Sequence, residues 1–146
     1  FHTRLPIVLP SRITADFISM LTGLRAQPSM VVHANHGNEV AGDCVYALLT
    51  LVLSGSPVLN QAVLLAGVND NLDALETLCR QLINLGVMPY YLHLLDPVAG
   101  AARFEVRLAH AQRLLEELRL RLPGYLVPRM VREVPGEPFK TPVSRL

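Results

Sequence analysis

The chain has 146 residues, of which 51% are hydrophobic and 17% are charged, and its formal net charge is +1. This length suits one domain or a large part of one, and so apolar a composition excludes a disordered chain. The small net charge and the absence of Trp give no support for a partner that is a nucleic acid or an acidic membrane surface.

Five short apolar runs, which start about 25 to 40 residues apart, predict β-strands because each is bounded by polar or turn-forming residues. The runs are apolar on both faces, as expected for strands of a parallel sheet that is covered by helices. The predicted strands are Leu5–Leu9, Met30–Ala34, Val58–Leu65, Val87–Leu95 and Tyr125–Val134.

Segments with helical period lie between these runs, and several carry capping residues at their ends. The predicted helices are one capped by Thr14 with a stripe of Phe17, Leu21 and Leu24, one over Val40–Leu53, one capped by Asp70 or Asn71 and closed at Gly86, and one with a stripe of Leu108, Ala111, Leu115, Leu118 and Leu122.

The alternation of strands and helices predicts an α/β fold built from βαβ units with a parallel sheet. Half of a (β/α)₈-type barrel and a small doubly wound sheet both fit this pattern. No Gly-rich dinucleotide or phosphate loop follows any strand, which favours the half barrel. We expect residues 1–134 to form the βα units of a partial barrel and residues 135–146 to form a tail.

Polar residues at the carboxyl ends of the strands are the candidates for chemistry, because parallel barrels carry their active sites there. They are His33, Asn35, His36, Asn60, Gln61, His93, Asp96, Arg132, Glu133 and, in the tail, Lys140.

Each candidate also has a purely structural interpretation. The His-x-x-His pair could be half of a metal site, but zinc needs three or four ligands. Asn60 and Gln61 could be core amides, and Asp96 before a proline could start a turn. Arg132 and Glu133 could be a solvated pair, and a lysine in a Pro-rich tail is usually plain surface.

Cys44 and Cys79 cannot by themselves hold an iron–sulfur cluster, which takes three or four ligands. The longest apolar run, Val45–Leu53, is shorter than the roughly 20 residues of a membrane span. The chain begins with Phe1 and has no signal-peptide pattern. We therefore expect a cytoplasmic location and a chain that begins inside something longer.

Seven segments in order along the chain resemble the lysine 2,3-aminomutase family, and more closely its bacterial branch that supplies β-lysine for modifying elongation factor P. Any one of them is weak, but seven in family order are a specific signal. They are His2–Thr14, His33–His36, Asn60–Leu65, Gly67–Asp70, Met88–His93, Gly124–Pro128 and Gly136–Pro142.

The resemblance implies the C-terminal part of a radical S-adenosylmethionine (β/α) barrel. It implies a [4Fe–4S] cluster that cleaves S-adenosylmethionine, and pyridoxal 5′-phosphate that holds the amino group as it moves from Cα to Cβ. The family's pyridoxal lysine matches Lys140, and an arginine that binds the cofactor phosphate matches Arg4. Two acidic residues that hold the substrate's side-chain ammonium match Asp96 and Glu133. The residues that the resemblance places on the S-adenosylmethionine side are His33, Asn35 and Gln61.

The chain also departs from the family. The Cys-x-x-x-Cys-x-x-Cys motif for the cluster is absent, so we expect no metal ligands here and no aminomutase activity from the 146 residues alone. Ala62 and Ala66 stand where Ser and Arg are usual. These departures leave open a non-catalytic remnant with a vestigial pocket, and the acidic pair leaves open another cationic amino acid as substrate. The expected partners are free L-lysine or a similar cationic amino acid and the missing N-terminal half of the barrel, and a second copy of the chain is a further candidate.

Overall fold

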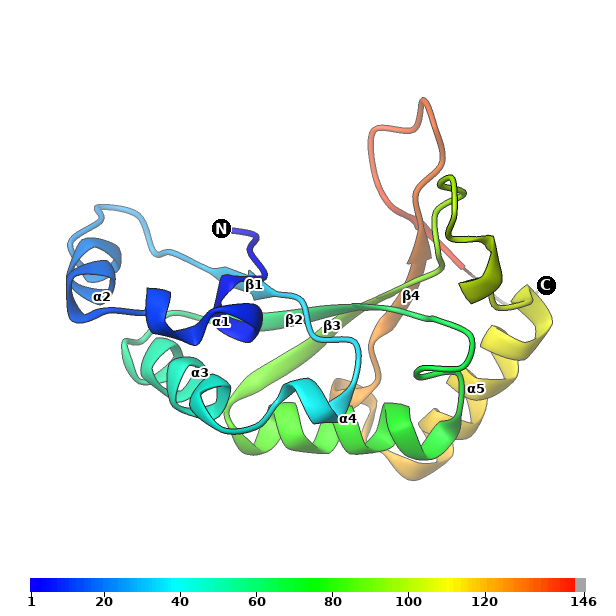
Figure 1. Ribbon diagram of the computed structural model, residues 1–146, viewed down its shortest axis with the longest axis horizontal. Coiled ribbons are helices and arrows are strands. Elements are labelled where there is room, and N and C mark those ends of the chain that lie inside the picture. Colours follow the sequence, from blue (N-terminus) through cyan, green and yellow to red (C-terminus); the bar gives the residue numbers. More distant parts are fainter. Residues whose placement is uncertain (144–146) are drawn as a thin grey trace.

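A sheet of five strands runs through the described part of the chain, residues 1–143, in the computed structural model (Figure 1). The last three residues of the tail expected at 135–146 lie outside the described residues. The helices are α1 (Leu5–Val8), α2 (Ala15–Thr22), α3 (Asp43–Leu53), α4 (Leu72–Asn84) and α5 (Leu108–Arg121). The strands are β1 (Met30–Val32), β2 (Val58–Val63), β3 (Val87–His93), β4 (Arg129–Arg132) and β5 (Thr141–Pro142).

The strands follow one another across the sheet in the order β1-β2-β3-β4-β5. The first four are parallel, and β5 is antiparallel to β4. Helices α3, α4 and α5 lie on one side of the sheet (Figure 1). A doubly wound sheet would reverse its strand order and carry helices on both faces. The sequential order confirms the predicted segment of a (β/α) barrel.

The predicted strand at Leu5–Leu9 is wrong, because the segment forms helix α1. Pro6 lies in the first turn of α1, where its fixed φ suits a helix and its missing N–H is no loss. The Thr3 hydroxyl accepts a hydrogen bond of 3.1 Å from the Leu5 N–H, which starts the turn. The apolar run that suggested a strand instead buries Pro6 and Ile7 in the first turn of α1.

The residues before α1 lie along β1. His2 forms a parallel bridge with Val31, whose N–H donates to the Phe1 carbonyl at 2.7 Å. The Thr3 N–H donates to the Val31 carbonyl at 3.0 Å. The sheet therefore continues past β1, and the strand predicted near residue 5 is displaced to residues 1–3 and reduced to a bridge.

Most other element types are confirmed, and their ends differ for local reasons. Helix α3 starts at Asp43 because Gly42 has a φ of +54°, which a helix cannot continue through. Helix α2 ends at Thr22, so Leu24 lies beyond the stripe predicted for it. The Thr14 and Asn71 caps are confirmed, since each side-chain oxygen accepts a backbone N–H of its helix.

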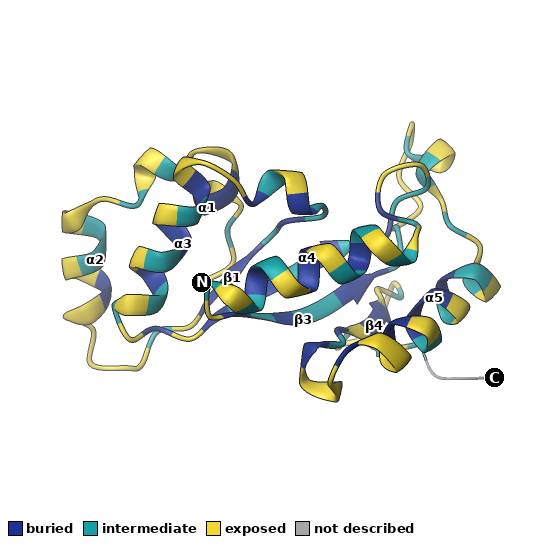
Figure 2. Ribbon diagram, turned by 90° about the horizontal axis from the view of Figure 1, so that it is seen from below, coloured by how far each residue is buried: buried dark blue, intermediate teal, exposed yellow. Residues whose placement is uncertain are grey.

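The hydrophobic core lies between the sheet and helices α3, α4 and α5. Figure 2 shows α4 with exposed residues facing away from the sheet and buried residues toward it. This stripe repeats at the three- and four-residue spacing of an amphipathic helix. The fully buried leucines of the core include Leu48, Leu51, Leu82, Leu92 and Leu118.

Among residues 1–143, no helix has the length and the apolar composition that a membrane span requires.

A bulge in β3 decides which of its side chains face which side of the sheet. Asn60 pairs with Pro89 and Gln61 pairs with Tyr91, so Tyr90 is an extra residue without a partner in β2. Because side chains alternate along a strand, the bulge puts Tyr91 and His93 on the same face as Gln61. We call this face the open face, and we call the face under α3 and α4 the covered face.

Candidate functional site

A cavity of about 260 Å³ lies at the carboxyl ends of the parallel strands, where a barrel carries its chemistry. It gathers six of the seven residues that the sequence predicted for the site. The six are Arg4, His33, Asn35, Gln61, Asp96 and Glu133.

Lys140, the seventh predicted residue, reaches the site through an ion pair. Its Nζ donates to Glu133 Oε1 at 2.5 Å, and its side chain is 28% exposed. This hydrogen bond holds the pKa of the Glu133 carboxyl below its usual value. The pair forms because β5 lies antiparallel to β4, with Thr141 opposite Arg132. Lys140, Glu133 and Asp96 also line an adjoining cavity of about 560 Å³.

Lys140 is also distinctive in composition, because it is the only lysine of the 146 residues, beside twelve arginines. An arginine serves most surface roles of a cation, but its guanidinium cannot act as an amine nucleophile. This contrast is a sequence signal that points to Lys140 without any structure.

Arg4 stands at the N-terminus of α1, and its guanidinium lies 3.5 Å from a carboxylate oxygen of Glu39. The other Glu39 oxygen, Oε1, accepts from the backbone N–H groups of Asn35 at 2.7 Å and of His36 at 2.9 Å. Glu39 therefore ties Arg4 to the segment that follows β1. A guanidinium has five donors, so this long contact leaves N–H groups for an anion.

His36 has a structural role in the segment that follows β1. Its Nδ1 accepts from the Asn38 N–H at 3.1 Å and caps the short turn that follows. Within residues 1–143, no group of three or more His, Cys, Asp or Glu side chains could hold a metal ion. The half-metal-site interpretation of the His-x-x-His spacing has no further ligand here.

Two buried amides near the site have structural partners. Asn60 Oδ1 accepts from the Ala34 N–H at 2.8 Å, and Asn60 Nδ2 donates to the Ala34 carbonyl at 3.0 Å. Asn60 is therefore the core amide that the structural interpretation of the sequence described. Asn69, which the sequence analysis did not single out, is fully buried, and its Nδ2 donates to the carbonyls of Asn35 and Val63. Asn35 Oδ1 accepts from the Val63 N–H, so these amides lock the ends of β1 and β2 together.

Three polar atoms in the cavity wall are buried and have no hydrogen-bond partner among the described residues. They are His33 Nε2, Gln61 Oε1 and His93 Nε2. Burial lowers the pKa of His33 and of His93, with further lowering by Arg4 and Lys140, respectively. Both imidazoles therefore favour the neutral form, which has one donor and one acceptor nitrogen. Unpaired buried polar atoms are rare in folded proteins, and three of the four found among residues 1–143 lie in this one cavity wall, the fourth being Gln81 Oε1 on α4.

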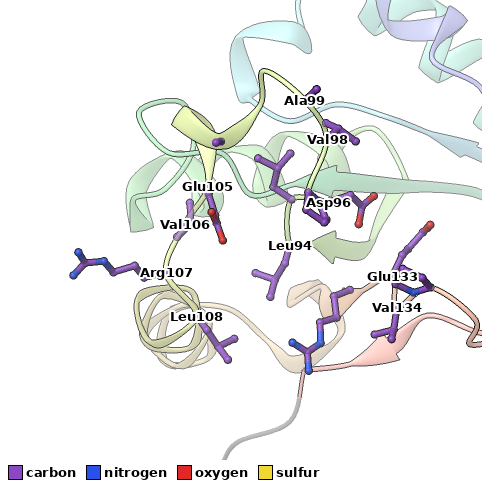
Figure 3. A pocket seen from close by; sticks show the side chains of 15 residues that line it. Leu94, Asp96, Val98, Ala99, Glu105, Val106, Arg107, Leu108, Glu133 and Val134 are labelled. Carbon is purple, nitrogen blue, oxygen red and sulfur yellow. The ribbon is translucent and has the colours of Figure 1, made fainter.

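A larger cavity of about 800 Å³ begins where Asp96 and Glu133 stand (Figure 3). Figure 3 shows Asp96 and Glu133 beyond the ends of the neighbouring strands β3 and β4. Apolar side chains, among them Leu94, Val106 and Leu108, line this cavity, and so do the charged side chains of Glu105, Arg107 and Arg132. A cavity that combines apolar side chains with the Asp96 and Glu133 carboxylates can take an aliphatic ligand that carries a cation.

The two cysteines do not suit an iron–sulfur cluster. Cys44 lies on α3 and Cys79 lies on α4, and both are buried and unbridged. Burial raises the pKa of both thiols, that of Cys79 to about 12. Cluster ligands are thiolates, so these side chains do not fit that role.

Curated relatives cover nearly the whole chain, although no protein-family model matches it. It is 45% identical over 140 residues to "L-lysine 2,3-aminomutase" of Haemophilus influenzae, a match that covers 96% of this chain and 41% of that protein. It is 46% identical over 143 residues to "L-lysine 2,3-aminomutase" of Escherichia coli K12, with 98% and 42% covered. The enzyme of that name from Clostridium subterminale is 37% identical over 142 residues, with 97% and 34% covered.

The chain thus spans about two fifths of the length of the first two relatives. Among solved structures, a radical SAM methyltransferase from Sphaerobacter thermophilus aligns with a TM-score of 0.60 and 22% identity. That alignment covers 82% of this chain and 38% of the other. This likeness supports the barrel segment as a fold and carries no argument about the reaction.

Proposed function

Because the chain belongs to the lysine 2,3-aminomutase family, we propose that the protein it forms part of converts L-α-lysine to β-lysine. The observation that carries this proposal is the gathering of Arg4, Asp96, Glu133 and the sole lysine, Lys140, around one set of strand ends. These residue types are the ones that a cationic amino acid and a phosphorylated aldehyde cofactor require. A scaffold would need none of them.

Pyridoxal 5′-phosphate, when bound, supplies covalent attachment of the substrate amine and delocalisation of an unpaired electron. Lys140 would hold its aldehyde carbon, since a partly buried amine is the nucleophile for that carbon. Arg4 would hold the phosphate, because a guanidinium fork can donate two bonds to it at once. The free N–H groups of Arg4 and the position of Lys140 beside the cavity fit this cofactor.

Asp96 and Glu133 would hold the side-chain ammonium of lysine. Two carboxylates attract a cation and repel an acidic side chain, and the apolar wall beside them suits the methylene chain. The Lys140 ammonium pairs with Glu133 in this structure. A substrate ammonium and Lys140 therefore compete for the Glu133 carboxylate. When the cofactor occupies Lys140, Glu133 would be free to bind the substrate ammonium.

His33, Asn35 and Gln61 would face S-adenosylmethionine. The unpaired His33 Nε2 and Gln61 Oε1 support this for two of them. Asn35 uses its Oδ1 to hold the end of β2, so its Nδ2 is the group left for a ligand. The described residues do not fit the [4Fe–4S] cluster, and we propose that its ligands lie elsewhere in the protein.

Other features of the proposal rest on the family resemblance. We propose that the β-lysine serves to modify elongation factor P, that the reaction is cytoplasmic, and that the 146 residues alone are inactive. Free, unbridged cysteines support a reducing compartment. We propose that residues 1–134 are barrel units and residues 135–146 the cofactor-bearing tail, and that the rest of the barrel or a second copy of the chain completes the site.

The first experiment locates pyridoxal on the intact protein. Pyridoxal phosphate is added, the complex is reduced with borohydride, and peptides are mapped by mass spectrometry. We expect the pyridoxyl group on Lys140 and none on this segment of the Lys140→Arg variant, which keeps the charge beside Glu133. A pyridoxyl group elsewhere, with Lys140 unmodified, would contradict the proposal.

The second experiment measures the reaction. The intact protein, supplied with iron, sulfide, S-adenosylmethionine and pyridoxal phosphate, should make β-lysine from L-lysine, whereas the 146-residue chain should make none. The vestigial pocket is the alternative, and we infer from the family resemblance that the departure at Ala66 favours it, whereas the departure at Ala62 concerns a residue that lines the cavity. Pyridoxal on Lys140 without any β-lysine would favour that alternative.

A further inference from the structure

His93 is the most buried titratable side chain of the cavity wall, and the proposed function gives it no role. It is the last residue of β3 and is 7% exposed. Its backbone carbonyl accepts from the Leu64 N–H at 2.8 Å, so the main chain is satisfied. Its Nε2, by contrast, is buried without a partner among residues 1–143. Buried polar atoms without a partner are rare in folded proteins, so His93 Nε2 is available to a group outside the described residues.

The ring of His93 is held in place by its surroundings. The residue pairs with Val63 of β2 and with Val131 of β4, so it stands in the middle of the sheet. The Tyr91 ring lies edge-on to it at 5.7 Å between centroids and 83° between planes. The bulge at Tyr90 places both rings on the open face. The ring of His93, and with it Nε2, is therefore held in a fixed position.

The charged neighbours of His93 show which part of the site it serves. Burial lowers the pKa of His93; among its charged neighbours, Lys140 and His33 lower this pKa further, whereas Glu133 and Asp96 raise it. All of these except Lys140 line the same small cavity, and Lys140 joins it through Glu133. His93 thus lines the same cavity as residues proposed to hold the cofactor and the substrate and residues proposed to face S-adenosylmethionine.

We propose that His93 is a further binding residue, whose neutral imidazole makes a hydrogen bond through Nε2 to the pyridoxal group held at Lys140. This inference rests on the proposed function. A neutral imidazole can donate or accept at Nε2, and it adds no charge beside the Lys140–Glu133 pair. The bond would fix the plane of the cofactor ring relative to the open face.

The test compares the intact protein with variants at His93. His93→Phe keeps a ring of similar size without a polar atom, and His93→Gln restores a polar atom near the position of Nε2. Met88→Leu is the matched control, because Met88 is a half-buried residue of the same strand outside the cavity. The probe is pyridoxal phosphate alone. Its affinity is measured by borohydride trapping at Lys140, and its environment by the visible absorbance of the bound cofactor.

We expect His93→Phe to weaken pyridoxal phosphate about threefold to tenfold, as the loss of one hydrogen bond to a bound group does. Its visible absorbance band should also shift, which a merely structural role would not cause. His93→Gln should recover most of the affinity, and Met88→Leu should match the wild type. If the phenylalanine variant does not fold by its thermal melt, His93→Leu replaces it with the same expectation.

Two results overturn the inference in different ways. If the wild type carries pyridoxal on Lys140 and His93→Phe matches it in affinity and absorbance, the role of His93 is wrong and the proposed function stands. If the wild type does not carry pyridoxal on Lys140, the proposed function fails and this inference fails with it.

Discussion

The two faces of the sheet treat buried polar groups in opposite ways. On the covered face, Asn60 is 3% exposed and both ends of its amide are bonded to Ala34. On the open face, Gln61 and His93 each bury a polar atom that has no partner among the described residues. Asn60 and Gln61 are adjacent in the sequence, so composition does not separate them. The Asn60 amide, which holds the fold together, is hydrogen-bonded within the chain. Gln61 and His93 each keep one polar atom without a hydrogen bond, as side chains that bind a ligand would.

The largest effect should come from the covered face. Leu92→Ala removes a fully buried side chain from the core and should lower the free energy of unfolding by about 2–5 kcal/mol. Met88→Ala, on the open face of the same strand, should cost only about 1 kcal/mol because Met88 is half-buried. Urea unfolding of the two variants checks this, and equal losses would break the distinction between the faces.

The neighbouring amides provide a sharper comparison. Asn60→Leu keeps a similar shape but leaves the Ala34 N–H and carbonyl unpaired, and should cost about 2–3 kcal/mol. Gln61→Met removes an atom that already lacks a partner. The free energy of unfolding of this variant should therefore fall by less than about 0.5 kcal/mol, or it should rise. The comparison uses the same urea unfolding without ligand. A large loss in Gln61→Met would mean that its amide already serves the fold.

The smallest effect is a dependence of stability on pH. The pKa values of His33 and His93 are lowered in the folded state, so the unfolded chain binds more protons over the interval below the ordinary value of 6.5. Stability should therefore be greatest above that value and should fall as the pH drops from about 8 to about 5.5. The Glu133 carboxyl acts in the same direction, but only at lower pH, because its lowered pKa matters below its ordinary value of 4.5.

Thermal melts across this range check the sign. A variant with His33→Gln and His93→Gln should show a flatter dependence than the wild type. A wild-type melting temperature that rises on acidification, or an unchanged slope in the double variant, would rule out the burial of neutral imidazoles in the open face.

Several features of the site could be predicted from the sequence because they depend on local pattern. Asp96 and Glu133 both follow apolar strands, and this pattern predicts that they lie at the same edge of the sheet. The structure brings both side chains to one cavity. His93 was recognised as a strand-end residue but was given no role. The missing signal was its unpaired Nε2, which depends on what surrounds the ring and not on its neighbours in sequence.

The sequence by itself determined the alternation of strands and helices, the Thr14 cap, a cap at Asp70 or Asn71, the single lysine and the resemblance to the lysine 2,3-aminomutases. Hydrophobic period and capping act within a few residues, so they are legible without a fold. The tertiary structure decided that Leu5–Val8 is a helix, that the bulge at Tyr90 turns His93 to the open face, and that Lys140 pairs with Glu133. Strand register and the pairing of buried polar atoms depend on contacts between distant segments, and a one-residue shift reverses every side chain that follows it.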